Sequence, residues 1–146
     1  MFARIMSIVS PSIFLASSIV WGLSTGNLIA GVLSVALGVA AAFMSFRAWR
    51  RTTGGVAERL TGVERQEVVD AVRVAWKRYW KSAAFIAALY GLNLVLGFAL
   101  RGAYRFGAWD VLMAWYIVDG AVFSSWVELL RARAGKLAGE SESAAS

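Results

Sequence analysis

The strongest constraint on this chain is a stretch without any charged residue, which runs from Ile5 to Phe46. A single straight helix over these 42 positions would be about 63 Å long, at a rise of about 1.5 Å per residue. The hydrocarbon core of a bilayer is only about 30 Å thick. The stretch must therefore turn back, and the glycines and polar residues of 22–27 mark the turn. We expect two spanning helices, over about 3–22 and 28–47, within an N-terminal hairpin of residues 1–51.

Pro11 interrupts the first of these expected spans. A helix that began with Ser10 as N-cap and Pro11 as its first residue would be too short to cross a membrane. We therefore expect a kinked spanning helix, with Ser7 and Ser10 near the kink to satisfy freed backbone groups. A re-entrant first segment is the alternative.

Two further apolar segments lie in the second half of the chain. Ser82–Leu100 contains no charged residue, whereas 109–127 is weaker because it contains Asp119 and Asp110. The short link between them makes the two segments antiparallel neighbours, in a C-terminal transmembrane hairpin over 82–130. The expected fold is all-α: a polytopic membrane protein with four transmembrane helices in two antiparallel hairpins.

Composition supports membrane insertion and narrows the chemistry. Hydrophobic residues make up 59% of the chain, against about 45–50% in soluble domains. Histidine and cysteine are both absent, which removes imidazole bases, thiol nucleophiles and most transition-metal ligands. We therefore expect no metal, no cofactor and no enzymatic activity.

The positive charges indicate an orientation. Lys and Arg residues lie at the ends of the apolar segments, where they meet anionic headgroups, so we expect a lipid partner and no nucleic acid. With four spans, thirteen of the fifteen Lys and Arg residues share one side with both termini, and only Arg101 and Arg105 lie on the other. By the positive-inside rule this side is the cytoplasm, which predicts a multi-pass protein of the cell (inner) membrane.

The segment 52–81 is expected to be a cytoplasmic linker followed by an amphipathic helix. Thr61 and Glu64 match a capping box, and no Gly or Pro follows between Val63 and Tyr90, so the helix should continue into the third span, over about 62–100. The tail of 131–146 is small and polar and is expected to be disordered. One face of the helix is apolar: Val68, Val69, Val72, Ala75, Trp76 and Tyr79.

Aromatic and basic residues mingle where this helix should enter the membrane, which is typical of an interfacial belt. Most other tryptophans, Trp49 among them, also fall near predicted boundaries, whereas Trp115 lies closer to a span interior. The predicted anchors are Trp76, Tyr79, Trp80, Lys77, Arg78 and Lys81.

Asp119 is the foremost candidate for a functional residue, because a carboxylate within a span usually faces the bundle or a water path. Counting from the expected cytoplasmic ends of the two antiparallel spans puts Tyr90 and Asn93 at a similar depth to Asp119. We therefore expect these three residues to form an intramembrane polar cluster. It would serve either as an interhelical hydrogen-bond clasp or as a proton or cation relay.

Small residues on the second expected span recur at spacings of three and four, which lets helices approach closely. The pattern predicts packing within the chain or between copies. This stripe consists of Gly31, Ser34, Gly38, Ala41 and Ser45.

Three functions are compatible with these features. The leading hypothesis is a non-enzymatic membrane-embedded interaction or assembly partner, which binds another membrane protein or forms a homo-oligomer. The alternatives are a pore-forming holin-like or small channel protein, and a small proton-coupled transporter that uses Asp119.

Overall fold

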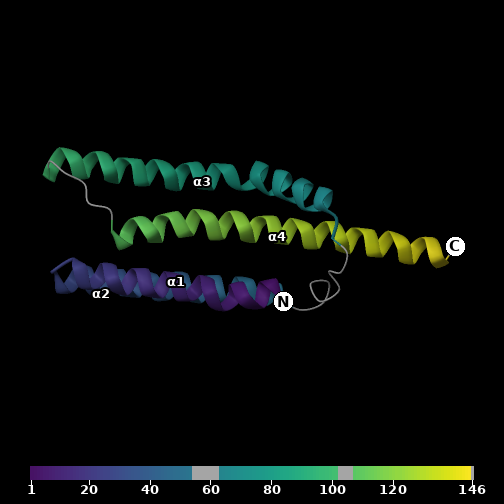
Figure 1. Ribbon diagram of the computed structural model, residues 1–146, viewed down its shortest axis with the longest axis horizontal. Helices are drawn as coiled ribbons and strands as arrows, with labels where there is room; N and C mark the ends of the chain where they lie inside the picture. The colour runs from purple at the N-terminus through teal and green to yellow at the C-terminus, as the bar shows by residue number, and fades with distance from the viewer. Residues whose placement is uncertain (54–62, 102–106, 146) are drawn as a thin grey trace.

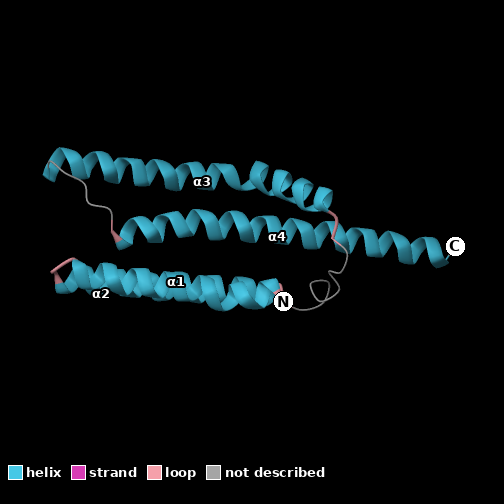
Figure 2. Cartoon of the chain, viewed as in Figure 1, coloured by secondary structure: helices cyan, strands magenta, loops and turns pink. Residues whose placement is uncertain are grey.

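The computed structural model describes residues 1–53, 63–101 and 107–145, and the elements within them are helices (Figures 1 and 2). They are α1 (Phe2–Ser24), α2 (Leu28–Arg51), α3 (Arg65–Arg101) and α4 (Ala108–Ala145). α1 packs along α2, α4 packs along α3, and α1 also contacts α4. Helix α4 therefore lies between α3 and the α1–α2 pair, and α3 is at the edge (Figure 1).

The turn between α1 and α2 forms where the glycine and polar residues predicted it. Gly26 has a φ of 64°, a conformation that glycine adopts without a steric penalty. Asn27 then caps α2, because its Oδ1 accepts hydrogen bonds from the backbone N–H groups of Ile29 and Ala30 at 2.9 and 3.3 Å. This arrangement satisfies two of the free donors at the start of the helix.

Helix α1 continues through Pro11 as one helix of 23 residues. A helix beginning at Pro11, the basis of the re-entrant alternative, is therefore not what the chain forms. Ser7 donates to the carbonyl oxygen of Arg4, which is not the carbonyl group that Pro11 leaves without its N–H donor. Ser10 instead forms a hydrogen bond of 2.9 Å with the hydroxyl of Ser45 on α2.

Three of the described helices are long and apolar enough to cross a membrane: α1, α2 and the part of α3 up to Leu96. At 23 and 24 residues, α1 and α2 are each about 35 Å long, which matches the hydrocarbon thickness. Helix α4 does not meet the same criterion, although the expected fourth span lies within it. Three apolar helices of this length indicate a helical membrane protein.

The single long helix predicted through the second loop and the third span is confirmed, because α3 is unbroken from Arg65 to Arg101. Thr61 of the expected capping box lies outside the described residues. Of the expected apolar face of α3, Ala75 is buried, whereas Val68, Val72 and Trp76 are exposed. Close approach to α4 uses small side chains instead. The buried residues are Ala71, Ala75 and Ala83.

The C-terminal region also differs from the expectation, because α4 continues through 131–145 where an unstructured tail was predicted. Alanine supplies five of the fifteen residues of 131–145 and is the residue that most favours helix over coil. The prediction of an unstructured tail considered only that its residues are small and polar. It did not include a partner for the tail, and Glu67 of α3 supplies one by pairing with Arg133 and Lys136.

The small-residue stripe of α2 packs against α1. A β-carbon added at Gly31 would lie 3.0 Å from the carbonyl oxygen of Gly22, and Gly38 lies against Ser18. Ala41 packs against the core cluster formed by Phe14, Ala42 and Leu112. Ser34 and Ser45 are buried. The stripe therefore packs within the chain, and packing between copies stays a prediction.

We expect Gly38→Ala to lower the stability of the α1–α2 pair by about 1–3 kcal/mol, the usual cost of overpacking. The new β-carbon would lie 1.8 Å from the Oγ and 2.1 Å from the Cβ of Ser18, so rotation of the hydroxyl alone cannot relieve the clash. Unfolding followed in mild detergent measures the change. Gly91→Ala is the matched control, because no heavy atom of a neighbour lies within 4 Å of its added β-carbon. An equal loss in both variants would contradict the close approach at Gly38.

Candidate functional site

Asp119 lies in the N-terminal third of α4 and is 8% exposed. Its two carboxylate oxygens accept hydrogen bonds from α2. The indole Nε1 of Trp49 donates to Oδ1 at 2.9 Å, and the hydroxyl of Ser45 donates to Oδ2 at 3.2 Å. The carboxylate thus links α4 to α2 through side chains.

The hydrogen bonds continue from Ser45 into α1. Its hydroxyl lies 2.9 Å from that of Ser10, and Nε1 of Trp115 on α4 donates to Ser10 at 3.2 Å. The side chains of Ser10 and Trp49 are fully buried. We call this set of five residues the Asp119 network, and it joins α1, α2 and α4: Ser10, Ser45, Trp49, Trp115 and Asp119.

Aromatic rings enclose one end of the network. Trp49 makes edge contacts with Phe2 at 5.8 Å and with Phe123 at 5.1 Å between ring centroids. An apolar enclosure strengthens hydrogen bonds to a carboxylate, and it makes the loss of a partner costly. Both ends of the network are indoles, which donate but cannot accept a proton. This arrangement can act as a hydrogen-bond clasp between helices.

The predicted partners of Asp119 are not the ones that the structure brings to it. The hydroxyl of Tyr90 donates a hydrogen bond to Asp110 instead, and Asn93 is exposed on α3. The cluster of Asp119, Asn93 and Tyr90 expected from the sequence is therefore absent among the described contacts.

The register between α3 and α4 explains this difference. Tyr79 lies over Gly120, with its hydroxyl 3.4 Å from the carbonyl oxygen of Tyr116, and Tyr90 lies level with Asp110. Counting residues from the expected cytoplasmic ends placed Tyr90 level with Asp119. Asp119 lies nine residues after Asp110, which is about 14 Å along a helix. The count assumed that both spans end at one plane. The helices instead align through interlocking side chains.

Asp110 fixes the start of α4. It is 3% exposed, and its Oδ2 accepts a hydrogen bond of 2.6 Å from the backbone N–H of Gly107. A carboxylate in the first turn also interacts favourably with the helix dipole. With the bond from Tyr90, this residue joins the helix cap to the α3–α4 contact.

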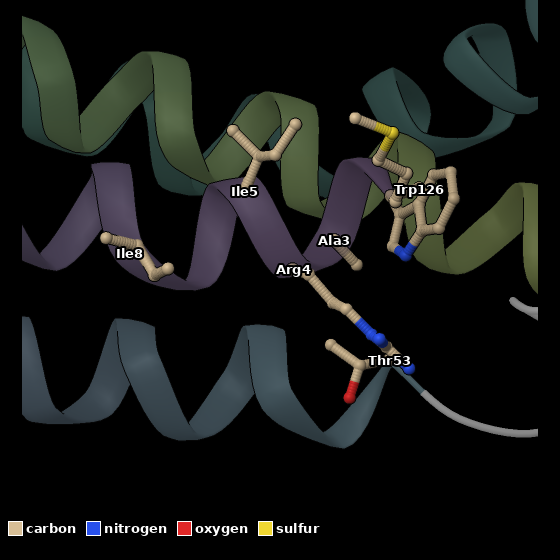
Figure 3. Close-up of a pocket in the computed structure, with 7 residues that line it drawn as sticks. Ala3, Arg4, Ile5, Ile8, Thr53 and Trp126 are labelled. Atoms are coloured by element: carbon tan, nitrogen blue, oxygen red, sulfur yellow. The ribbon is translucent and has the colours of Figure 1, made fainter.

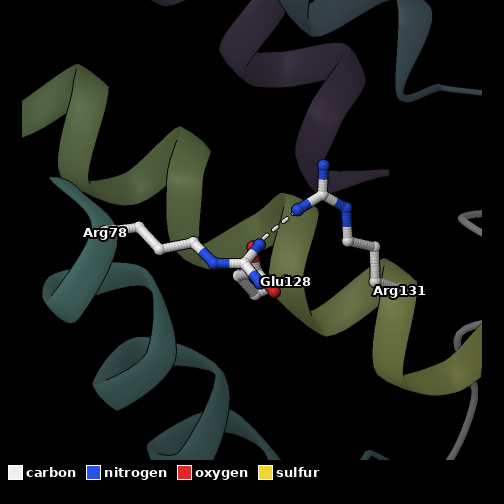
Figure 4. A network of polar contacts seen from close by, with 3 residues as sticks. All are labelled: Arg78, Glu128 and Arg131. Atoms are coloured by element: carbon white, nitrogen blue, oxygen red, sulfur yellow. Dashed lines mark hydrogen bonds and ion pairs between the residues drawn. The ribbon is translucent and has the colours of Figure 1, made fainter.

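Ion pairs connect α3 to α4 nearer the C-terminus. Glu128 binds Arg78 of α3 at 2.6 Å and Arg131 of its own helix at 2.7 Å (Figure 4). Glu67 binds Arg133 at 2.9 Å and also Lys136. The hydrogen bond from Lys136 lowers the pKa of Glu67, and the charge of Arg133 acts in the same direction. Because most of these cations are exposed, each pair contributes modest stability.

The predicted interfacial anchors take different positions on α3. Trp76 and Trp80 are exposed, as are Lys77 and Lys81. Tyr79 faces α4 and Arg78 pairs with Glu128. Trp49, two residues before the end of α2, is fully buried in the Asp119 network.

The sequence held partial signals for the residues that were missed. Ser45 belonged to the small-residue stripe, Ser10 lay beside Pro11, and Trp115 lay nearer a span interior than the other tryptophans. None of these signals specifies a partner, because each depends on how the helices are rotated against one another.

Within the described ranges, no group of three or more acidic, histidine or cysteine side chains could hold a metal ion. No family model, curated protein or solved structure matches this chain in comparison. Its chemistry must therefore be inferred from its own residues.

We expect Asp119→Leu to destabilise the protein by about 1–3 kcal/mol, because it leaves the donors of Trp49 and Ser45 buried without an acceptor. Asp119→Asn should cost less, since its amide oxygen can still accept one of these bonds. Unfolding in mild detergent measures both. Asn93→Leu is the control, and a loss in that variant equal to that of Asp119→Leu would argue against the network.

Proposed function

We propose that this chain is a non-enzymatic membrane-embedded interaction or assembly partner, which binds another transmembrane helix through α3. The observation that carries the proposal is the lack of cover on the second half of α3. Of the described side chains at 84–99, none is buried. Among the described side chains of the helix, Ala83 is the last that is buried.

The exposed half of α3 has the composition of a helix-packing surface. Ala84 and Ala88 are exposed one turn apart, and Gly91 is one turn beyond Ala87. Small residues at this spacing allow close approach in lipid, where association depends on packing and not on the hydrophobic effect. The comparable stripe on α2 is already used against α1. The stripe on α3 therefore supports binding to a separate helix.

A second surface of α3, which lines an apolar cavity, supports docking nearer the N-terminus of this helix. An apolar cavity of about 390 Å³ lies between α1, α3 and α4. Val68 and Val72, from the exposed face of α3, line it together with Phe2 and Leu129. A partner that lies along α3 would reach both surfaces.

The Asp119 network supports a structural role for the buried carboxylate in this proposal. Its two oxygens are occupied by donors from α2, and the donor-only indoles at its ends offer no onward acceptor. A clasp of this kind holds α1, α2 and α4 together. Helix α3 is then left as the element presented to a partner.

We expect Ala88→Leu to reduce the amount of bound partner severalfold while leaving the chain folded, because the larger side chain prevents close approach on an exposed face. The measurement is affinity isolation from native membranes in mild detergent, with a second tagged copy to detect self-association. Ala40→Leu, exposed on α2, is the matched control. Isolation of neither a stoichiometric partner nor a second copy would contradict the proposal.

The proposed orientation is a four-span protein of the inner membrane with both termini in the cytoplasm, supported by the thirteen-to-two distribution of Lys and Arg. The absence of cysteine allows single reporter cysteines. In intact bacterial cells we expect an impermeant maleimide to label Ser24→Cys but not Leu137→Cys, which should react only after permeabilisation. Labelling of both in intact cells would show that α4 does not cross.

A further inference from the structure

The outward face of α3 carries a row of three cations. Arg73, Lys77 and Lys81 are spaced four residues apart, so their side chains project from one face of the helix. All three are exposed, whereas Tyr79 between them turns towards α4. Arg73 pairs with Asp70 at 3.9 Å. Within the part of the chain that the structure describes, neither Lys77 nor Lys81 pairs with a carboxylate.

The depth of this row follows from contacts between the helices. In the proposed orientation the cytoplasmic end of the bundle is marked by Phe2, whose ring centroid lies 5.2 Å from that of Trp126 on α4. Figure 3 shows Trp126 beside the start of α1, with Thr53, which follows α2, at the same end. The hydroxyl of Tyr79 on α3 donates to the carbonyl oxygen of Tyr116 at 3.4 Å. Tyr116 is ten residues before Trp126, so this contact lies about 15 Å further into the bundle.

Lys81 therefore lies near the level of the middle of α1. Phe14, one residue from the midpoint of α1, packs its ring against that of Tyr116 at 6.4 Å between centroids. Lys81 is two residues after Tyr79, although the expected span over 82–100 placed it at the cytoplasmic boundary. A boundary at the level of Phe14 would leave eleven residues of α1, about 17 Å, to cross a core of about 30 Å. With α1 spanning the membrane, Lys81 lies within the hydrocarbon region.

An exposed ammonium group at this depth requires a counter-charge. Ionisable side chains within spans are costly in free energy, and they pair with one another or face water. Lys77 is nearer the cytoplasm and can extend its ammonium group towards the headgroups, whereas Lys81 starts about 6 Å deeper. The carboxylate of Asp119 is already occupied, because it accepts hydrogen bonds from Trp49 and Ser45 of α2. The counter-charge for Lys81 therefore has to come from another molecule.

The surroundings of Lys81 specify the kind of molecule. Ala84 and Ala88 continue the same face of α3 and are exposed, so a second helix can approach closely there. A second copy docked symmetrically through this face would set two Lys81 ammonium groups against each other, and like charges disfavour such an interface. A lipid supplies its phosphate at the membrane surface and not at the level of Phe14. A transmembrane helix with a carboxylate in its span meets both requirements.

We propose that α3 binds a transmembrane helix of a different protein, whose Asp or Glu side chain near the middle of its span pairs with Lys81. This inference rests on the proposed function and names the chemistry of the partner. The alanines admit the partner helix, and the ion pair fixes its position along α3. Because water is excluded at this depth, the attraction between the two charges is stronger than in a surface ion pair.

The test uses synthetic transmembrane peptides of leucine and alanine that carry one central residue, which is Glu, Gln or Lys. Binding to the full chain in phosphatidylcholine vesicles is measured by energy transfer, from a donor on Ser24→Cys to an acceptor on the peptide. We expect the Glu peptide to bind about tenfold more tightly than the Gln peptide, in line with loss of a charge-assisted bond. Lys81→Gln should remove this preference, and Lys81→Glu should transfer it to the Lys peptide.

Arg47→Gln is the matched control, because it removes a positive charge from an exposed position on α2. This variant should keep the preference for the Glu peptide. Equal binding of the Glu and Gln peptides, or binding of neither, would overturn the proposal, as would a preference that persists in Lys81→Gln. Loss of the preference when phosphatidylglycerol replaces phosphatidylcholine would also overturn it, by assigning the counter-charge to lipid headgroups.

Self-association is measured in the same vesicles, by energy transfer between two labelled copies of the chain. We expect less transfer between copies than to the Glu peptide. Stronger transfer between copies, abolished by Ala88→Leu, would overturn the proposal in favour of a homo-oligomer. The two proposals can fail separately: a native partner without a carboxylate would satisfy the isolation experiment while the Glu and Gln peptides bind equally.

Discussion

The arrangement of the first, second and fourth helices depends on one buried carboxylate. Asp119 accepts hydrogen bonds from Trp49 and Ser45 of α2, and Ser45 in turn bonds to Ser10 of α1. In a lipid environment apolar side chains gain little by leaving the solvent, so interhelical hydrogen bonds and close packing must specify which helices pair. The Asp119 network specifies the pairing of α1, α2 and α4 at one position along the bundle axis.

Close packing acts at other levels along the same helices. Gly22 faces Gly31 near the α1–α2 turn, and Gly38 admits Ser18 midway. These contacts require small residues because a β-carbon has no room there. The α1–α2 pair is therefore held along its length, by packing at the turn and by hydrogen bonds towards the other end.

Helix α3 is attached in a different way, mainly through contacts with α4. Its register is set by three kinds of contact. They are the buried alanines Ala71, Ala75 and Ala83, the contact of Tyr79 with Gly120, and the hydrogen bond from Tyr90 to Asp110. Ion pairs to Glu67 and Glu128 extend the contact beyond the apolar region. The result is a helix anchored through one face, with its remaining apolar surface open to lipid or to a partner. The proposed function depends on this asymmetry.

The sequence by itself determined the local features of the protein. The uncharged stretch from Ile5 to Phe46 required a turn, and Gly26 and Asn27 form it, since turn chemistry depends on adjacent residues alone. The absence of helix breakers likewise predicted the continuous α3. The helical tail of α4 was missed because its partner on α3 is distant in the sequence.

Only the tertiary structure decided the partners of the buried polar groups. Asp119 could be identified from the sequence, because a carboxylate within an apolar span costs free energy. Its hydrogen bonds to Trp49 and Ser45 could not be predicted in this way. Hydropathy reports how apolar a helix is, and it fixes neither the rotation of the helix nor its axial register. A shift of nine residues separated Tyr90 from Asp119 and brought it to Asp110. Rotation and register arise from which side chains interlock across an interface, and that information exists only when two helices are placed together.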